Sequence, residues 1–359
     1  GRVSIIFGTL LVSMLNLIVF ADSSEMTELE KINAYGKIYL YSLIVPLISI
    51  SGIFLAYINK QNKLKSLIKN GIAPIKAKGM IFISPELTKP NVLIIIGSII
   101  FVLFTLFIGT SKIQFSQEIV FVGSFGIILL LLIKLSNELD TKAKRMLLGT
   151  AIIIFVFRAM PGVGQGGSWF EIDVLKFDQE FLSLLGLIAS FLTIFGIFIL
   201  RPLMEKSSMS RLIIILSVAG SIFILPSIAM YYGFHEYTSK LTGGIVDERF
   251  IAIFNTALES PLGQVSMIPI LAWIAQSAPS HLKATFFAIL ASFTNLALSA
   301  SNLGTKYLNQ IFVITREVKT EQGEIKIPAD YSELGILLII VCLLTLIVPI
   351  IITLSLIHI

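Results

Sequence analysis

The residues best suited to chemistry in this sequence are charged side chains inside long apolar segments. Arg158 follows six apolar residues in the stretch IIIFVFRAMPGVGQGG, and Glu259 lies within the largely apolar segment 249–276. At about 1.5 Å per helical residue, Arg158 lies about 18 Å and Glu259 about 15 Å from the end of its segment. A charge at that depth in a bilayer costs at least about 2.5 kcal/mol, so such residues usually face a polar interior. Their opposite charges at similar depth would also allow an ion pair.

A polar stripe runs along a third apolar segment, 283–308. Its members recur at steps of three and four residues, which places them on one helix face: Ser292, Asn295, Ser299, Asn302 and Lys306. Asn255, one turn before Glu259, begins a similar stripe. Two interpretations stay open, because these residues could be an ion pair and polar contacts that lock helices together, or the lining of an aqueous cavity. Since three segments contribute at one depth, we favour the cavity.

The stretch PGVGQGG after Arg158 is rich in glycine. It follows no strand and lacks the spacing of a phosphate-binding loop, so nucleotide binding is not predicted. Proline and glycine loosen a helix end, and we therefore expect a gate formed by Pro161, Gly164, Gly166 and Gly167. Lys306, near the end of its own segment, is expected to extend its ammonium group to water.

The elements that must position these residues are transmembrane helices. Of 359 residues, 55% are hydrophobic and only 14% are charged, far from the roughly 25% charged residues of a soluble domain. Segments of about 17 to 25 apolar residues can cross the bilayer. We expect ten such spans: 4–21, 38–58, 91–109, 118–134, 146–164, 179–200, 210–232, 249–276, 283–308 and 334–356. The predicted fold class is an all-α polytopic membrane protein.

Orientation follows from the distribution of lysine and arginine. With Arg2 inside, the inner loops hold sixteen of these residues and the outer loops nine. Cytoplasmic loops carry the excess of positive charge, so both termini are expected to be cytoplasmic. The single cysteine and three scattered histidines form no metal-ligand spacing, and no catalytic constellation is present. We expect no enzyme, no cofactor, no metal and no nucleic-acid partner.

The layout resembles the major facilitator superfamily, with two six-helix bundles and a cytoplasmic connection. On this resemblance, residues 1–134 are a partial N-terminal bundle of four spans, 135–145 the connection and 146–359 a C-terminal six-helix bundle. Only four spans precede the connection, so an N-terminally truncated chain with about ten of twelve helices is expected. The repeats of such folds are parallel halves of the molecule.

Within that superfamily, the second half is similar to the folate-biopterin transporter family. Two stretches carry the resemblance: LGQVSMIP, from Leu262 to Pro269, and PSHLKATFFAILASFTN, from Pro279 to Asn295. The sequence departs from the family pattern at Asn255, where relatives tend to carry an aspartate, and at Lys283, where they tend to carry a glutamate. The first departure could remove a carboxylate, and Glu259 could replace it.

The resemblance implies a secondary transporter that moves folate, pterin or a related anionic metabolite by alternating access. Arg158 would bind a substrate carboxylate, and Asn255, Ser292 and Asn295 would donate neutral hydrogen bonds. Glu259 would also bind substrate, and it would gain and lose the coupling proton during the transport cycle, as in a symporter. We expect a monomer in the lipid bilayer of the plasma (inner) membrane. The alternatives are transport of another organic anion, such as an acyl-CoA or nucleotide, and a membrane assembly factor that does not transport.

Overall fold

The computed structural model describes residues 2–20, 27–81, 92–111, 113–137, 139–263, 265–277, 283–320 and 324–356. The helices of the first part are α1 (Arg2–Val19), α2 (Glu28–Ser42), α3 (Ile44–Lys69), α4 (Pro74–Ile81), α5 (Val92–Thr110) and α6 (Ser116–Ser136). Gln264 and Pro279, from the two motif stretches, lie outside the described residues. Of the first part, α1, α5 and α6 coincide closely with expected spans.

The second part contains most of the interhelical contacts. Its helices are α7 (Thr141–Arg158), α8 (Gln165–Asp173), α9 (Gln179–Ile199), α10 (Arg201–Lys206), α11 (Met209–Tyr231), α12 (Phe234–Leu241), α13 (Glu248–Glu259), α14 (Met267–Ser277), α15 (Lys283–Ile311) and α16 (Leu334–Leu356). One turn of 3-10 helix, η1 (Ser260–Leu262), follows α13, and a small antiparallel hairpin, β1 (Val318–Lys319) with β2 (Ile325–Ile327), precedes α16.

Short polar residues define where several helices begin. Asp140 accepts a hydrogen bond from the Ala143 N–H at 2.8 Å at the start of α7, and Asp178 accepts one from Phe181 at 2.7 Å at the start of α9. Asp247 caps α13 in the same way. An N-cap side chain satisfies one of the backbone donors that the first helical turn leaves open. These caps lie at the ends of apolar segments, where the chain returns to water.

Six helical stretches in the described part of the chain are long and apolar enough to cross a membrane. They are Ile32–Lys69, Ser116–Ser136, Gln179–Ile199, Met209–Tyr231, Thr285–Ile311 and Leu334–Leu356. Ile6–Val19 and Ile95–Thr110 are shorter apolar helices. The chain is an all-α polytopic membrane protein, with the small hairpin as an addition that the sequence analysis did not predict. Its apolar surface is extensive, as expected for helices that face lipid: α3 has no buried residue.

Three of the expected spans differ from the observed helices. The span expected over 38–58 begins within α2 and continues in α3 to Lys69, with a break at Leu43. The helix expected over 146–164 begins at Thr141 and ends at Arg158, because the chain leaves helical geometry at the residues before Pro161. The helix expected over 249–276 is interrupted between Glu259 and Met267. The prediction of one continuous helix over 249–276 was therefore wrong, whereas the end of α7 before Pro161 agrees with the expected loosening of that helix end by proline and glycine.

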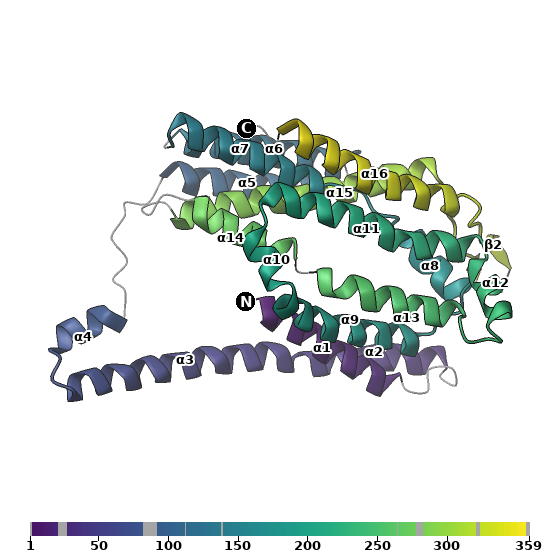
Figure 1. The fold of residues 1–359 in the computed structure, drawn as a ribbon, viewed down its shortest axis with the longest axis horizontal. Coiled ribbons are helices and arrows are strands. Elements are labelled where there is room, and N and C mark those ends of the chain that lie inside the picture. The colour runs from purple at the N-terminus through teal and green to yellow at the C-terminus, as the bar shows by residue number, and fades with distance from the viewer. Residues whose placement is uncertain are drawn as a thin grey trace.

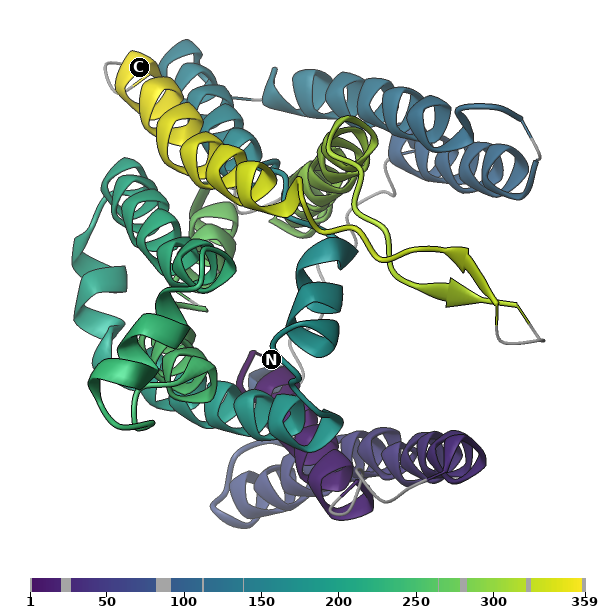
Figure 2. The same cartoon turned by 90° about the vertical axis from the view of Figure 1, so that its right-hand side faces the viewer.

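The helices form a curved row rather than a closed ring (Figure 2). Contacts between neighbours follow the order α5, α6, α15, α7, α16, α11, α13, α9 and α1. One apolar core, which includes Leu132, Ile154 and Phe286, joins α6, α7, α14 and α15. A second core joins α8, α9, α11 and α16 at the end of the molecule that carries α8, α12 and the hairpin, called here the hairpin end (Figure 1).

Candidate functional site

Arg158 is the last residue of α7 and its side chain reaches between two other helices. Nε donates a hydrogen bond to the Thr294 carbonyl oxygen on α15 at 3.1 Å, and a terminal guanidinium nitrogen lies 3.3 Å from the Met267 sulfur at the start of α14. The side chain is half-buried. An arginine has five N–H donors in a planar fork, a geometry that matches the two oxygens of a carboxylate.

The stretch after Arg158 leaves helical geometry and is held by side chains of α15. Ser301 donates to the Met160 carbonyl at 2.7 Å, and Thr305 accepts from the Gly162 N–H at 2.9 Å. Asn309 donates to the Val163 carbonyl at 3.1 Å. Residues 301, 305 and 309 are four apart and share one face of α15. The sequence analysis missed this row because it followed the other polar face, although the spacing of four was visible.

Two of the glycines proposed as a gate lie in close contact with α15 and the residues that follow it. Gly164 has φ +80°, and a Cβ there would lie 2.9 Å from the Asn309 side-chain nitrogen. A Cβ on Gly166 would lie 2.8 Å from Ile314. Glycine is therefore required at these positions by conformation and by space. Their role as a gate, with Pro161 and Gly167, stays a prediction.

The second interruption lies between α13 and α14, at residues 260–266. Thr193 of α9 donates to the Ser260 carbonyl at 2.9 Å, and Ser260 donates to the Thr256 carbonyl. Gly196, also on α9, is in such close contact with the Pro261 backbone that no Cβ could be accommodated. Pro261 and Gly263 were the sequence signals that could have predicted the interruption.

The ion pair considered for Arg158 and Glu259 is not among the ion pairs of the described residues. Glu259 is the last residue of α13 and its side chain is exposed, whereas Arg158 contacts Met267 of α14 and Thr294 of α15. The physical reason is the interruption after Glu259, which separates α13 from α14. Arg158 is thus held by contacts with α14 and α15.

The remaining candidate residues lie on two helices. Ser292 and Asn295 are exposed on α15, and Asn295 directly follows Thr294, whose carbonyl accepts from Arg158. Asn255 is half-buried on α13, one turn before Glu259. The structure therefore places Arg158 against the backbone of α15 at Thr294, beside the group formed by Ser292 and Asn295 in the sequence. Nothing in the described contacts joins Asn255 or Glu259 to that group.

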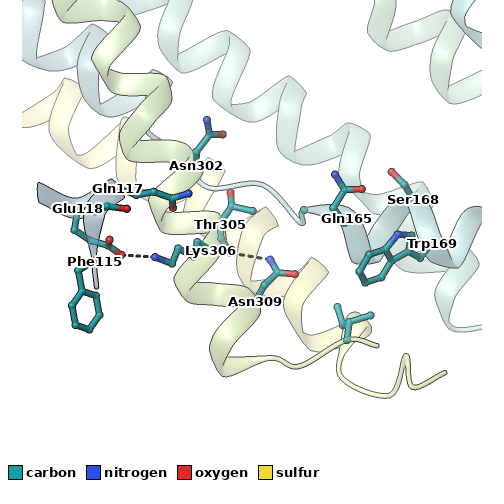
Figure 3. A pocket seen from close by; sticks show the side chains of 13 residues that line it. Phe115, Gln117, Glu118, Gln165, Ser168, Trp169, Asn302, Thr305, Lys306 and Asn309 are labelled. Carbon is teal, nitrogen blue, oxygen red and sulfur yellow. Dashed lines mark hydrogen bonds and ion pairs between the residues drawn. The ribbon is translucent and has the colours of Figure 1, made fainter. Parts of the chain in front are cut away.

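A pocket of about 1050 Å³ lies at the hairpin end, between the starts of α6 and α8 and the last turns of α15 (Figure 3). Its lining includes Glu118, Gln165, Trp169, Asn302 and Lys306. Lys306, which was expected to reach water, instead lies 2.6 Å from a carboxylate oxygen of Glu118. The sequence analysis missed Glu118 because the residue lies at the very start of an apolar span.

A cluster of polar side chains at the hairpin end fixes the far end of α8. Asp173 accepts from two Arg316 nitrogens, at 2.8 and 2.7 Å, and from the Tyr331 hydroxyl at 2.6 Å. The hydrogen bonds from Arg316 hold the pKa of the Asp173 carboxyl below its usual value. Burial and the bond to Asp173 raise the pKa of Tyr331 to about 12. The cluster links α8 to the segment between α15 and α16.

Comparison with known protein families shows to which family the chain belongs. A model of the BT1 family matches residues 5–359, nearly the whole chain. The chain belongs to the BT1 family. The match includes both interrupted helices, the polar stripe of α15 and the pocket at the hairpin end.

A curated relative is similar to part of this BT1 chain. It is a protein of Synechocystis sp. named folate-biopterin transporter, with 23% identity over 156 residues. The matched stretch is 44% of this chain and 30% of the relative, so the chain corresponds to less than a third of that protein. No solved structure matches the chain. The family therefore rests on the sequence match, and the geometry above describes how its residues are arranged here.

Proposed function

We propose that this protein is a secondary active transporter of folate, pterin or a related anionic metabolite. Membership of the BT1 family supports a transporter, and the name of the Synechocystis relative supports this substrate class. The observation that carries the proposal is the half-buried guanidinium of Arg158 at the junction of α7, α14 and α15. An arginine between interrupted helices is suited to hold a carboxylate inside a membrane.

In the proposed mechanism, substrate binds between the half before the 135–145 connection and the half after it. Arg158 holds a substrate carboxylate, while Ser292, Asn295 and Asn255 offer neutral hydrogen bonds to a heteroaromatic ring. Arg158 lies at the end of α7, Asn255 on α13, and Ser292 and Asn295 on α15. Transporter sites are commonly built from discontinuous helices in this way. Alternating access then exposes the site to one side of the membrane at a time, with Pro161 and the glycines as a gate.

Glu259 is the proposed coupling group, and it also contributes to substrate binding. Its carboxylate is exposed at the last residue of α13, beside the interruption, and can gain or lose a proton as the two halves move. If so, Glu259→Gln retains the shape of the side chain but loses the dependence of uptake on a pH gradient. If uptake by Glu259→Gln depended on the pH gradient as in wild type, Glu259 would not be the proton-coupling group.

The proposed setting is a monomer in the plasma (inner) membrane with both chain ends in the cytoplasm. The excess of lysine and arginine in the inner loops, sixteen against nine, supports this orientation. The hairpin end is then the outer end of the molecule. Cysteine labelling of the hairpin from outside intact cells tests the orientation directly.

The deciding experiment uses the full-length protein reconstituted in liposomes. Uptake of radiolabelled folic acid is measured for wild type, Arg158→Ala and Arg145→Ala, an exposed arginine of the same helix. Loss of a charge-assisted hydrogen bond predicts at least about a tenfold loss of uptake for Arg158→Ala and none for Arg145→Ala. Arg158→Lys, which retains the charge, separates lost binding from failure to fold.

The outcomes separate the competing functions. Uptake that only an acyl-CoA or a nucleotide inhibits would retain the transport mechanism and replace the substrate. An absence of uptake for every anion tested, in correctly folded wild-type protein, would favour an assembly factor. In that case Arg158→Ala and Glu259→Ala together would change only stability.

A further inference from the structure

The ion pair between Glu118 and Lys306 joins helices from opposite sides of the 135–145 connection. Glu118 lies in the first turn of α6, and Lys306 lies near the end of α15. The ammonium nitrogen is 2.6 Å from Glu118 Oε1, and the Tyr307 hydroxyl donates to the same oxygen at 2.9 Å (Figure 3). Two consecutive residues of α15 therefore hold one carboxylate of α6.

The carboxylate is only partly satisfied. Its side chain is 18% exposed and that of Lys306 is 35% exposed, so the pair is shielded but not sealed from water. The second oxygen, Oε2, is buried and has no hydrogen-bond partner among the described residues. A buried acceptor without a partner costs free energy. The pair is thus less stable than one in which both carboxylate oxygens accept hydrogen bonds.

The same ion pair forms part of the wall of the 1050 Å³ pocket. Across the pocket from Lys306 lie Gln165 and Trp169 of α8, and Asn302 lies one turn before Lys306 on α15 (Figure 3). An indole ring can stack on a flat heterocycle, and amides can hydrogen-bond its polar edge. The pocket therefore combines an aromatic surface, amide groups and an ammonium group that already binds a carboxylate.

We propose that this pocket is an outer docking site in which a substrate carboxylate replaces Glu118 on Lys306 and thereby releases the first turn of α6 from the last turns of α15, while the shared apolar core still holds the two helices together. The ligand is an anion with a carboxylate attached to a flat heteroaromatic group. No charge is lost in the exchange, because one carboxylate takes the place of another and Glu118 turns to the water of the pocket. This inference rests on the proposed function, since it gives the same substrate a first binding site and makes its arrival the signal for opening.

The first test measures, without substrate, whether the ion pair between Glu118 and Lys306 keeps the outer end of the protein closed. Ser299 is exposed on the same face of α15 as Asn302, one turn further from the hairpin end. In full-length protein with all other cysteines replaced, Ser299→Cys reports access from the outside to a membrane-impermeant thiol reagent. Glu118→Gln is expected to raise the labelling rate by up to about fivefold, the effect of losing one ion pair.

Two controls make this test specific. Glu205→Gln removes the partner of Arg201 in a pair within α10, and it should leave the labelling rate unchanged. The charge exchange Glu118→Lys with Lys306→Glu should restore slow labelling, whereas either change alone should accelerate it. Equal labelling rates in wild type and Glu118→Gln would contradict the proposal that this ion pair keeps the outer end closed.

The second test uses two ligands that differ in the carboxylate. Folic acid carries carboxylates and biopterin carries none, so only folic acid should accelerate labelling of Ser299→Cys. Lys306→Met should abolish that acceleration and raise the KM for folic acid at least about tenfold, with a smaller change in kcat. The proposed exchange of carboxylates on Lys306 would be contradicted if biopterin accelerated labelling as much as folic acid does. It would also be contradicted if folic acid still accelerated labelling in Lys306→Met.

Failure of this inference and failure of the proposed function are distinguishable. If wild-type protein transports folic acid but Glu118→Gln does not change the labelling rate, the proposed function stands and the docking site is contradicted. If wild-type protein transports no anion, the proposed function is contradicted. The labelling test without substrate still decides whether Glu118 and Lys306 close the outer end.

Discussion

The two interrupted helices are stabilised in different ways. Residues 160–163, after α7, have their backbone groups bonded to the side chains of Ser301, Thr305 and Asn309. The interruption after α13 is held mainly by one helix, α9, through the Thr193 hydrogen bond and the close contact of Gly196 with Pro261. The first can rearrange by exchanging hydrogen bonds, whereas the second requires two backbones to separate. This difference suggests that α9 and the α13–α14 interruption move as one body.

The largest expected effect comes from separating those backbones. Gly196→Ala places a methyl group against the Pro261 backbone, which cannot yield as a flexible side chain can. We expect a loss of about 3 kcal/mol in stability, the upper part of the usual range for overpacking. Thermal unfolding of the purified protein checks this. Gly126→Ala in α6, where nothing lies within 4 Å of the new methyl, should be neutral or stabilising.

A smaller effect is expected at the first interruption. Gly164→Ala forces a side chain into a backbone conformation with φ +80° and towards Asn309. The expected cost is about 1 to 3 kcal/mol. Gly162→Ala is the matched control, because its methyl would lie 4.0 Å from Thr305 and its φ is ordinary. Equal unfolding temperatures for the two variants would contradict the requirement for glycine at 164.

The hydrogen bonds of the two interruptions can be compared directly. Thr305→Val and Thr193→Val each retain the shape of the side chain but remove its bond to Gly162 or to Ser260, together with the bond of the same hydroxyl to its own helix, at Ser301 or Ala189. Each should cost about 1 kcal/mol in stability. The two losses should add in the double variant, because the two sites share no partner. A double variant much less stable than that sum would mean that the interruptions are coupled.

The smallest effect is expected at the far end of α8 and depends on pH. Because Arg316 lowers the pKa of Asp173 in the folded protein, the pair stabilises the fold above the usual aspartate pKa of about 3.9. This contribution is lost as pH falls through the lowered pKa. Asp173→Asn should cost less than about 1 kcal/mol at pH 7, since the pair is partly exposed. Unfolding temperatures of the variant and wild type should converge in acid.

Hydropathy allowed the membrane helices to be predicted. Proline and glycine indicated the loosened helix end after Arg158, but the interruption after Glu259 was not predicted. Segments such as 334–356 are long and uniformly apolar, so their helices coincide with the expected spans. At Pro261 the segment stays apolar on average, and hydropathy gives no signal when the backbone turns there. Polar partners were found only where they fell on one helix, as for Asn295. Glu118 and Lys306 are 188 residues apart, and only the tertiary fold brings them together.

The position of Arg158 has a consequence for how the chain enters the membrane during synthesis. Helix α7 carries Lys142, Lys144, Arg145 and Arg158 within 18 residues. The acceptor of Arg158, the Thr294 carbonyl, is translated 136 residues later. An arginine costs about 2.5 to 3.5 kcal/mol during insertion by the translocon when it lies at the helix centre, and this is the upper bound for Arg158 at the end of α7. We therefore expect this helix to enter the bilayer poorly by itself and to be held more stably once α15 has been translated, late in synthesis.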